Sequence, residues 1–85
     1  MSQYKKLLLS VLSGAKDQDI SFSDLQLILE RLGFQSRIKG GHFIYTKDGI
    51  EEIINIQPKN GKAKPYQVKQ IRAIILRYRL GGDVV

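Results

Sequence analysis

The chain has 85 residues, 42% of them hydrophobic, which suits one small folded domain and excludes a disordered tail. It contains no cysteine and a single histidine, so a disulfide framework and a thiolate zinc site are excluded, and we expect neither a metal nor a cofactor. The net charge is +6, and residues 53–82 carry seven lysines and arginines without one acidic residue. Such one-sided charge favours a polyanion such as nucleic acid, although a solvated basic face that only maintains solubility has the same composition.

The first predicted element is a helix that ends near Gly14, because apolar residues recur before it at helical spacing. These residues are Tyr4, Leu7, Leu8, Val11 and Leu12. The apolar run 7–12 is far shorter than a membrane span, and no A-x-A cleavage site follows it. We therefore expect a cytoplasmic protein with no membrane partner.

A second helix is predicted after a polar loop. Ser21 followed by Asp24 resembles a capping box, and Gly33 is a plausible stop. Its expected buried residues are Phe22, Leu25, Ile28, Leu29 and Leu32.

Three strands are predicted next, over residues 34–39, 42–47 and 50–57, which are β-branched or alternate in polarity. Gly40-Gly41 and Asp48-Gly49 separate them and favour two-residue hairpin turns, hence an antiparallel meander. Two such turns predict four pairs: Lys39–His42, Ile38–Phe43, Phe43–Ile54 and His42–Asn55.

Because side chains alternate between the faces of a sheet, this register predicts one covered face and one open face. The residues expected to pack on the helices are Phe34, Ile38, Phe43, Ile54 and Ile56. The residues expected on the open face are Arg37, Lys39, His42, Ile44, Ile53 and Asn55.

The chain then continues through a basic loop into a last helix, with Pro65 at its first position. The apolar stripe of this helix is Val68, Ile71, Ile74, Ile75 and Tyr78. The fold class is therefore α+β, with the order α-α-β-β-β-α in one domain over residues 1–85.

His42 is the candidate for chemistry. The neighbouring Arg37 and Lys39 disfavour a charged imidazole ring, so more of it is neutral near pH 7 and able to accept a proton. RNA supplies both a 2′-hydroxyl and an adjacent phosphate, so cleavage by internal attack is the reaction that such a site suits. An ordinary surface histidine beside a turn remains the alternative.

From residue 25 to residue 80 the sequence resembles the HicA family, the small toxins of bacterial toxin–antitoxin pairs. The stretches that carry the resemblance are "RLGF" at 31–34, "KGGH" at 39–42, "IINI" at 53–56 and "GKAKPYQVKQIRAIIL" at 61–76. Gly41 stands where the family has serine. Residues 1–20 add a helix and a loop to a HicA-like core over residues 21–80.

The resemblance implies a fold like that of double-stranded-RNA-binding domains and a ribosome-independent endonuclease that cleaves messenger RNA and is silenced by a HicB antitoxin. It implies His42 as the catalytic residue. The expected RNA contacts are Lys39, Gly41, Lys62, Lys64 and Lys69. A second proton-transfer group stays open among Tyr45, Lys39, water and the RNA itself.

Two other functions stay open beside the endonuclease. One is an RNA-binding module without catalysis, in which His42 is incidental. The other is a protein-interaction domain whose open sheet face docks a partner through Ile44 and Ile53.

Overall fold

The computed structural model describes residues 3–82, which form three helices and a three-stranded antiparallel sheet in the predicted order α-α-β-β-β-α. The elements are α1 (Gln3–Ser13), α2 (Phe22–Arg31), β1 (Gln35–Lys39), β2 (His42–Thr46), β3 (Ile54–Ile56) and α3 (Pro65–Tyr78). Each helix in this part of the chain is too short or too polar to cross a membrane.

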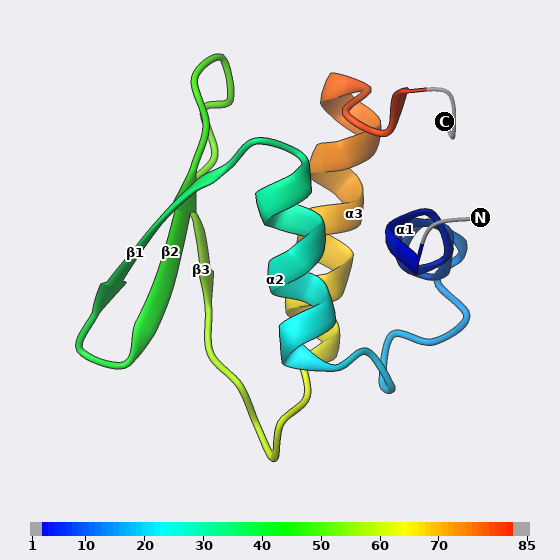
Figure 1. The fold of residues 1–85 in the computed structure, drawn as a ribbon, viewed down its shortest axis with the longest axis horizontal. Coiled ribbons are helices and arrows are strands. Elements are labelled where there is room, and N and C mark those ends of the chain that lie inside the picture. The colour runs from blue at the N-terminus through cyan, green and yellow to red at the C-terminus, as the bar shows by residue number, and fades with distance from the viewer. Residues whose placement is uncertain (1–2, 83–85) are drawn as a thin grey trace.

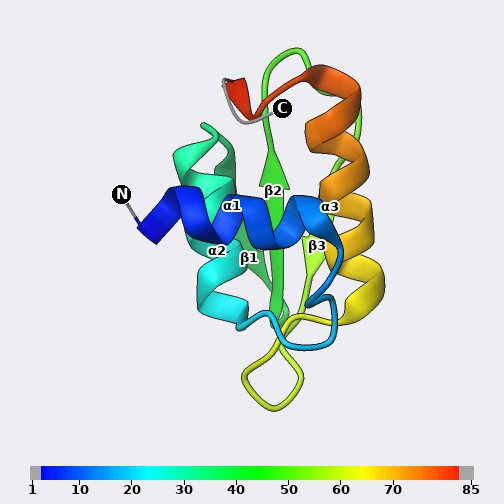
Figure 2. The same cartoon turned by 90° about the vertical axis from the view of Figure 1, so that its right-hand side faces the viewer.

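The elements are arranged in three layers. α2 and α3 lie side by side and cover one face of the sheet, which has the strand order β1-β2-β3 (Figure 1). α1 crosses both helices on the side away from the sheet (Figure 2). Within residues 3–82, no helix covers the other face of the sheet.

The hydrophobic core lies between these layers, and the predicted helical stripes supply most of it. All five apolar residues expected on α2 are buried, as are Val68, Ile71, Ile74 and Ile75 of α3. Leu8 and Val11 bring α1 into the same core. The Ser21 side chain accepts the Asp24 N–H (3.1 Å) and caps α2 as expected.

Arg72 of α3 joins the N-terminal segment to the rest of the fold. Its guanidinium donates to both carboxylate oxygens of Asp17, at 2.9 and 3.1 Å, and to the Val11 carbonyl at 3.1 Å. These side chains are mostly buried, so the pair is shielded from water. This clamp holds α1 and its following loop against α3.

The first hairpin has the predicted turn and register. Gly40 and Gly41 have φ of 57° and 82°, the left-handed values that a type I′ turn requires at both positions. Lys39 pairs with His42, and Ile38 pairs with Phe43.

The connection after β2 is longer than predicted. Asp48-Gly49 does form a turn, closed by the Ile50 N–H on the Lys47 carbonyl (3.1 Å). The following strand, however, starts only at Ile54, so the predicted strand 50–57 shortens to three residues.

A contact with α3 explains this delay. Glu52 accepts a hydrogen bond of 2.7 Å from the Tyr78 hydroxyl, which draws residues 47–53 toward the end of α3 instead of along β2. The expected pairs Phe43–Ile54 and His42–Asn55 are therefore wrong, and the observed pairs are Phe43–Ile56, Ile44–Asn55 and Tyr45–Ile54. Because the slip is two residues, the side chains that remain in the strands keep their predicted faces. Ile53, expected on the open face, instead lies in the connection before β3, and its side chain is exposed.

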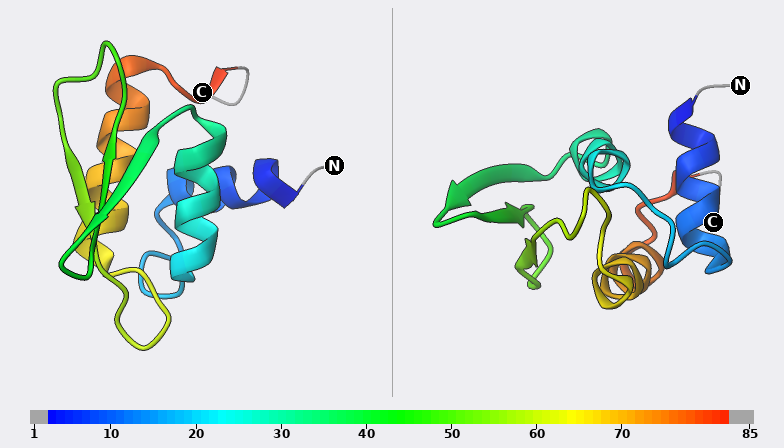
Figure 3. Two further views of the ribbon diagram at one scale, coloured as in Figure 1. Left: turned by 60° about the vertical axis from the view of Figure 1, so that its left-hand side comes forward. Right: turned by 90° about the horizontal axis from the view of Figure 1, so that it is seen from below.

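One residue of the expected covered face is exposed. Ile38 was predicted to pack on the helices, but 69% of it is accessible. The end of the β1–β2 hairpin projects beyond the helical layer, as the view from below shows (Figure 3). Phe43 lies at the limit of the core, edge-on to Phe22 with ring centroids 5.1 Å apart.

Candidate catalytic site on the open sheet face

His42 is the first residue of β2, and its half-buried side chain lies on the open face with Arg37 and Lys39, as predicted. The Gly40-Gly41 turn brings Lys39 directly opposite His42. The alternation that places them together sends Tyr45 to the other face, where it is 1% exposed. Burial raises the pKa of Tyr45. Tyr45 is therefore excluded as the second proton-transfer group.

Asn55 and Gln57 hold the two ring nitrogens of His42. The Asn55 Oδ1 lies 2.9 Å from Nδ1, and the Gln57 Nε2 lies 3.2 Å from the ring Nε2. An amide oxygen accepts and an amide nitrogen donates, so with these amide orientations Nδ1 carries the hydrogen and Nε2 presents its lone pair. The neutral ring is thereby fixed in the tautomer whose Nε2 can accept a proton.

The sequence pattern did not reveal Gln57. In the observed register, continuing β3 by one residue places Gln57 opposite His42, whereas the expected two-residue turn had placed Asn55 there. Finding Gln57 required the length of the connection after β2, because that length determines which residue faces His42. The length depends on the contact between Glu52 and Tyr78, which are far apart in the sequence.

A second hairpin turn shapes the basic loop, residues 57–64. Lys59 and Lys62 exchange backbone hydrogen bonds of 2.9 and 3.0 Å around Asn60-Gly61. Both central residues have positive φ, 54° and 77°. Asn-Gly is a strong hairpin signal, so this turn was predictable from the sequence, although the segment was expected only to be a loop.

The basic loop also pairs with the segment that precedes α2. The Ala63 N–H donates to the Ile20 carbonyl, and the Phe22 N–H donates to the Gly61 carbonyl, both at 2.9 Å. These bonds fix the loop at the start of α3 and α2.

The three lysines expected to bind phosphate here differ in their surroundings. Lys62 forms an ion pair of 2.8 Å with Asp19. The hydrogen bond and the charge of Lys62 lower the pKa of the Asp19 carboxyl. Lys64 is the N-cap residue of α3, and its backbone N–H donates to the buried Gln67 side chain. Lys69 is exposed on the second turn of α3. Lys62 is thus partly neutralised, whereas no ion pair involves Lys64 or Lys69 among residues 3–82.

The predicted site residues therefore form two groups. Lys39, Gly41 and His42 lie at the β1–β2 turn, and the three lysines lie around the start of α3. The β1–β2 turn and the basic loop lie at the same end of the molecule (Figures 1 and 3). Gln57, the first residue of the basic loop, connects the groups through its contact with the His42 ring.

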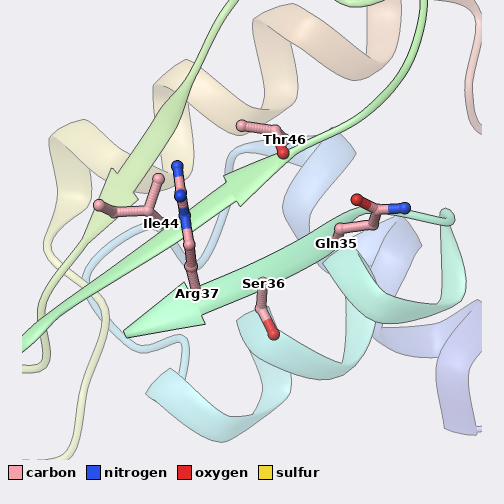
Figure 4. Close-up of a pocket in the computed structure, with 5 residues that line it drawn as sticks. All are labelled: Gln35, Ser36, Arg37, Ile44 and Thr46. Carbon is pink, nitrogen blue, oxygen red and sulfur yellow. The ribbon is translucent and has the colours of Figure 1, made fainter. Parts of the chain in front are cut away.

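A shallow hollow of about 320 Å³ adjoins this site on β1 and β2. It is lined by Gln35, Ser36, Arg37, Ile44 and Thr46 (Figure 4). The Arg37 side chain extends over β2 toward Ile44 in this view. No group of three His, Cys, Asp or Glu side chains that could hold a metal occurs within residues 3–82.

The model of the family described as the HicA toxin of bacterial toxin–antitoxin systems matches residues 22–77. The chain belongs to the HicA toxin family. It is thus a toxin component whose family implies a cognate antitoxin partner. The match includes the strands, α2 and nearly all of α3, and leaves α1 outside it. No curated protein and no solved structure matches the chain, so the likeness of this HicA toxin to double-stranded-RNA-binding domains stays a prediction.

Proposed function

We propose that this HicA toxin is an endoribonuclease that cleaves messenger RNA in the cytoplasm without a metal ion, with His42 as the general base. The observation that carries the proposal is that His42 donates its Nδ1–H to the Asn55 Oδ1 and accepts at Nε2 from the Gln57 amide. A ring that acts as a base must direct the lone pair of one nitrogen to the substrate, and these partners favour the tautomer with the hydrogen on Nδ1 and the lone pair on Nε2.

The reaction would begin when a 2′-hydroxyl replaces the Gln57 amide as the donor to Nε2. Nε2 removes the hydroxyl proton, O2′ attacks the adjacent phosphorus, and the bond from phosphorus to O5′ breaks. The products of this step are a 2′,3′-cyclic phosphate and a 5′-oxygen that must gain a proton. Water, the RNA, the imidazolium formed at His42 and the facing Lys39 are the remaining proton sources.

Cations would stabilise the charge that develops on the phosphate. Lys39 lies opposite His42, with Gly41 in the intervening turn, where the missing side chain leaves room for the RNA backbone. Lys64 and Lys69 at the start of α3 would hold a neighbouring phosphate, supported by the positive end of the helix dipole. Lys62 would join them only by leaving Asp19.

The test is the His42→Ala variant. Its free energy of unfolding should stay within about 0.5 kcal/mol of the parent, because the side chain is on the open face. RNA affinity should be retained, because lysines carry it, while single-turnover cleavage in EDTA should fall about a hundredfold or more. Thr46→Ala, on the same face of β2, is the matched control and should cleave like the parent.

A non-catalytic RNA-binding module is the second candidate, favoured by Gly41, which lacks the hydroxyl that serine provides in the family. The same assay separates the two functions. A parent protein that retards RNA in a gel but leaves it intact on long incubation would establish the binding module. Cleavage by His42→Ala at the rate of the parent would remove His42 from the mechanism.

A further inference from the structure

β1 is an edge strand with an unusual degree of exposure. It pairs with β2 on one side, and no strand within residues 3–82 pairs with its other side. All five of its residues are exposed, and Ile38 is accessible although it points to the side of the sheet that the helices cover elsewhere. Both faces and the outer edge of β1 are thus open to a partner.

The register shows which backbone groups lie on that edge. Residues of an antiparallel strand direct their N–H and C=O groups alternately to the two sides. The two residues that flank a two-residue turn exchange backbone hydrogen bonds. The backbone N–H and C=O groups of Lys39, and of every second residue before it, are therefore directed toward β2. Ser36 and Ile38 therefore direct their N–H and C=O groups outward, where another strand can pair with them.

The charge of β1 determines which strand fits. Arg37 and Lys39 lie on its open face, and β1 and β2 contain no acidic residue. A second copy that paired antiparallel along the whole of β1 would place Arg37 opposite Arg37, and like charges directly opposite destabilise a sheet. A strand with acidic residues at these positions would instead form cross-strand ion pairs.

We propose that β1 docks an extended, acidic segment of a partner protein, which adds a fourth strand to the sheet. The added strand carries acidic side chains opposite Arg37 and Lys39 and an apolar side chain opposite Ile38, because residues directly opposite share a face. The hollow beside Arg37 gives room for a side chain on the open face (Figure 4). This docking concerns the edge of the sheet and does not depend on catalysis by His42.

The probe is an eight-residue peptide, Thr-Val-Glu-Val-Glu-Val-Glu-Thr with blocked ends, titrated into the full chain and followed by amide resonances at low salt. Its lysine counterpart, Thr-Val-Lys-Val-Lys-Val-Lys-Thr, is the control. The acidic peptide should bind at least about tenfold more tightly than the basic one, because charge complementarity selects the partner. The amides of Ser36 and Ile38 should shift and gain protection from hydrogen exchange.

Three variants separate strand addition from general attraction to a basic protein. The double variant Arg37→Glu with Lys39→Glu should reverse the preference toward the lysine peptide. Ile38→Pro removes an outward N–H and should weaken binding of the acidic peptide about tenfold or more, while Ile38→Val keeps the N–H and should bind like the parent.

Three outcomes would overturn the proposal. One is that the acidic peptide shifts amides of the basic loop and α3 in place of those of β1. Another is that the double variant keeps the parent's preference. The third is that the free chain dimerises through β1, which would make a second copy the occupant.

Discussion

In the helical layer, α2 and α3 bury almost all of the apolar side chains that their sequence pattern offers, whereas β1, on the other side of the molecule, buries none of its five residues. The helices contribute the buried core around Leu25 and Ile71. The strands contribute one face to this core and leave the other face open, because their alternate residues lie on opposite faces.

The strands connect the two regions. Tyr45, Ile54 and Ile56 are at most 1% exposed against the helices, and they anchor β2 and β3 from one side. On the opposite side, the same strands present His42 and Asn55. The lesson is that the precision of the open face derives from packing on the covered face, so stability and function can be altered separately.

The largest effect is expected in the helical layer, for Leu25→Ala. Leu25 is fully buried on α2, and its truncation should lower the free energy of unfolding by about 3 kcal/mol, since it removes buried area and leaves a cavity. Urea unfolding followed by circular dichroism measures this. Leu9→Ala, at a site on α1 that is 43% exposed, is the control and should change stability by less than about 0.5 kcal/mol. Equal losses in both variants would contradict the distinction between core and surface.

The Arg72 clamp should follow next in size. Arg72→Met leaves the Asp17 carboxylate and the Val11 carbonyl without this donor, at an expected cost of about 2 kcal/mol. Asp17→Leu combined with Arg72→Met should cost less than the sum of the single changes, because the two groups interact. Lys62→Met, which removes the exposed ion pair with Asp19, should alter unfolding little. If the double variant loses as much stability as the two single variants together, Asp17 and Arg72 do not stabilise the fold through their interaction.

The sequence predicted the helices and the first hairpin because their signals are local. Apolar residues at helical spacing and a Gly-Gly pair depend only on nearby residues. The connection after β2 could not be predicted in this way, because Glu52 bonds to Tyr78 far along the chain. The exposure of Ile38 depends on where the helices end beneath the sheet, and the partnership of His42 with Gln57 depends on the register of β3.

A smaller effect is expected at Asn55, and it concerns cleavage rather than stability. Asn55→Leu removes the acceptor for Nδ1–H and should reduce cleavage about tenfold, because the ring loses its fixed orientation. Asn55→Asp should retain the bond while its negative charge favours the imidazolium, so the acidic limb of the pH–rate profile should move to higher pH. Gln57→Ala removes the donor that the 2′-hydroxyl replaces at Nε2 in the proposed reaction, so it should slow cleavage less than Asn55→Leu. If the pH–rate profile of Asn55→Asp matches that of the parent, residue 55 does not influence the protonation of the His42 ring.

The smallest effect should come from Glu52→Gln, which keeps an acceptor for Tyr78 but removes the charge. The hydrogen bond from Tyr78 lowers the pKa of Glu52, and the same bond raises the pKa of Tyr78 from its ordinary value of 10.0. A lowered carboxyl pKa stabilises the fold above the unfolded-state value and ceases to do so as pH falls through the folded-state value. A raised tyrosine pKa stabilises the fold below 10.0 and ceases to do so as pH rises through the folded-state value.

The difference in unfolding free energy between the parent and Glu52→Gln should therefore be level across neutral pH and diminish at both extremes. Urea unfolding at a series of pH values measures it. Glu51→Gln, at the exposed neighbouring side chain, is the matched control and should lack this profile. If the difference does not vary with pH, the charge of Glu52 does not hold residues 47–53 against α3, and the register that brings Gln57 to His42 must have another cause.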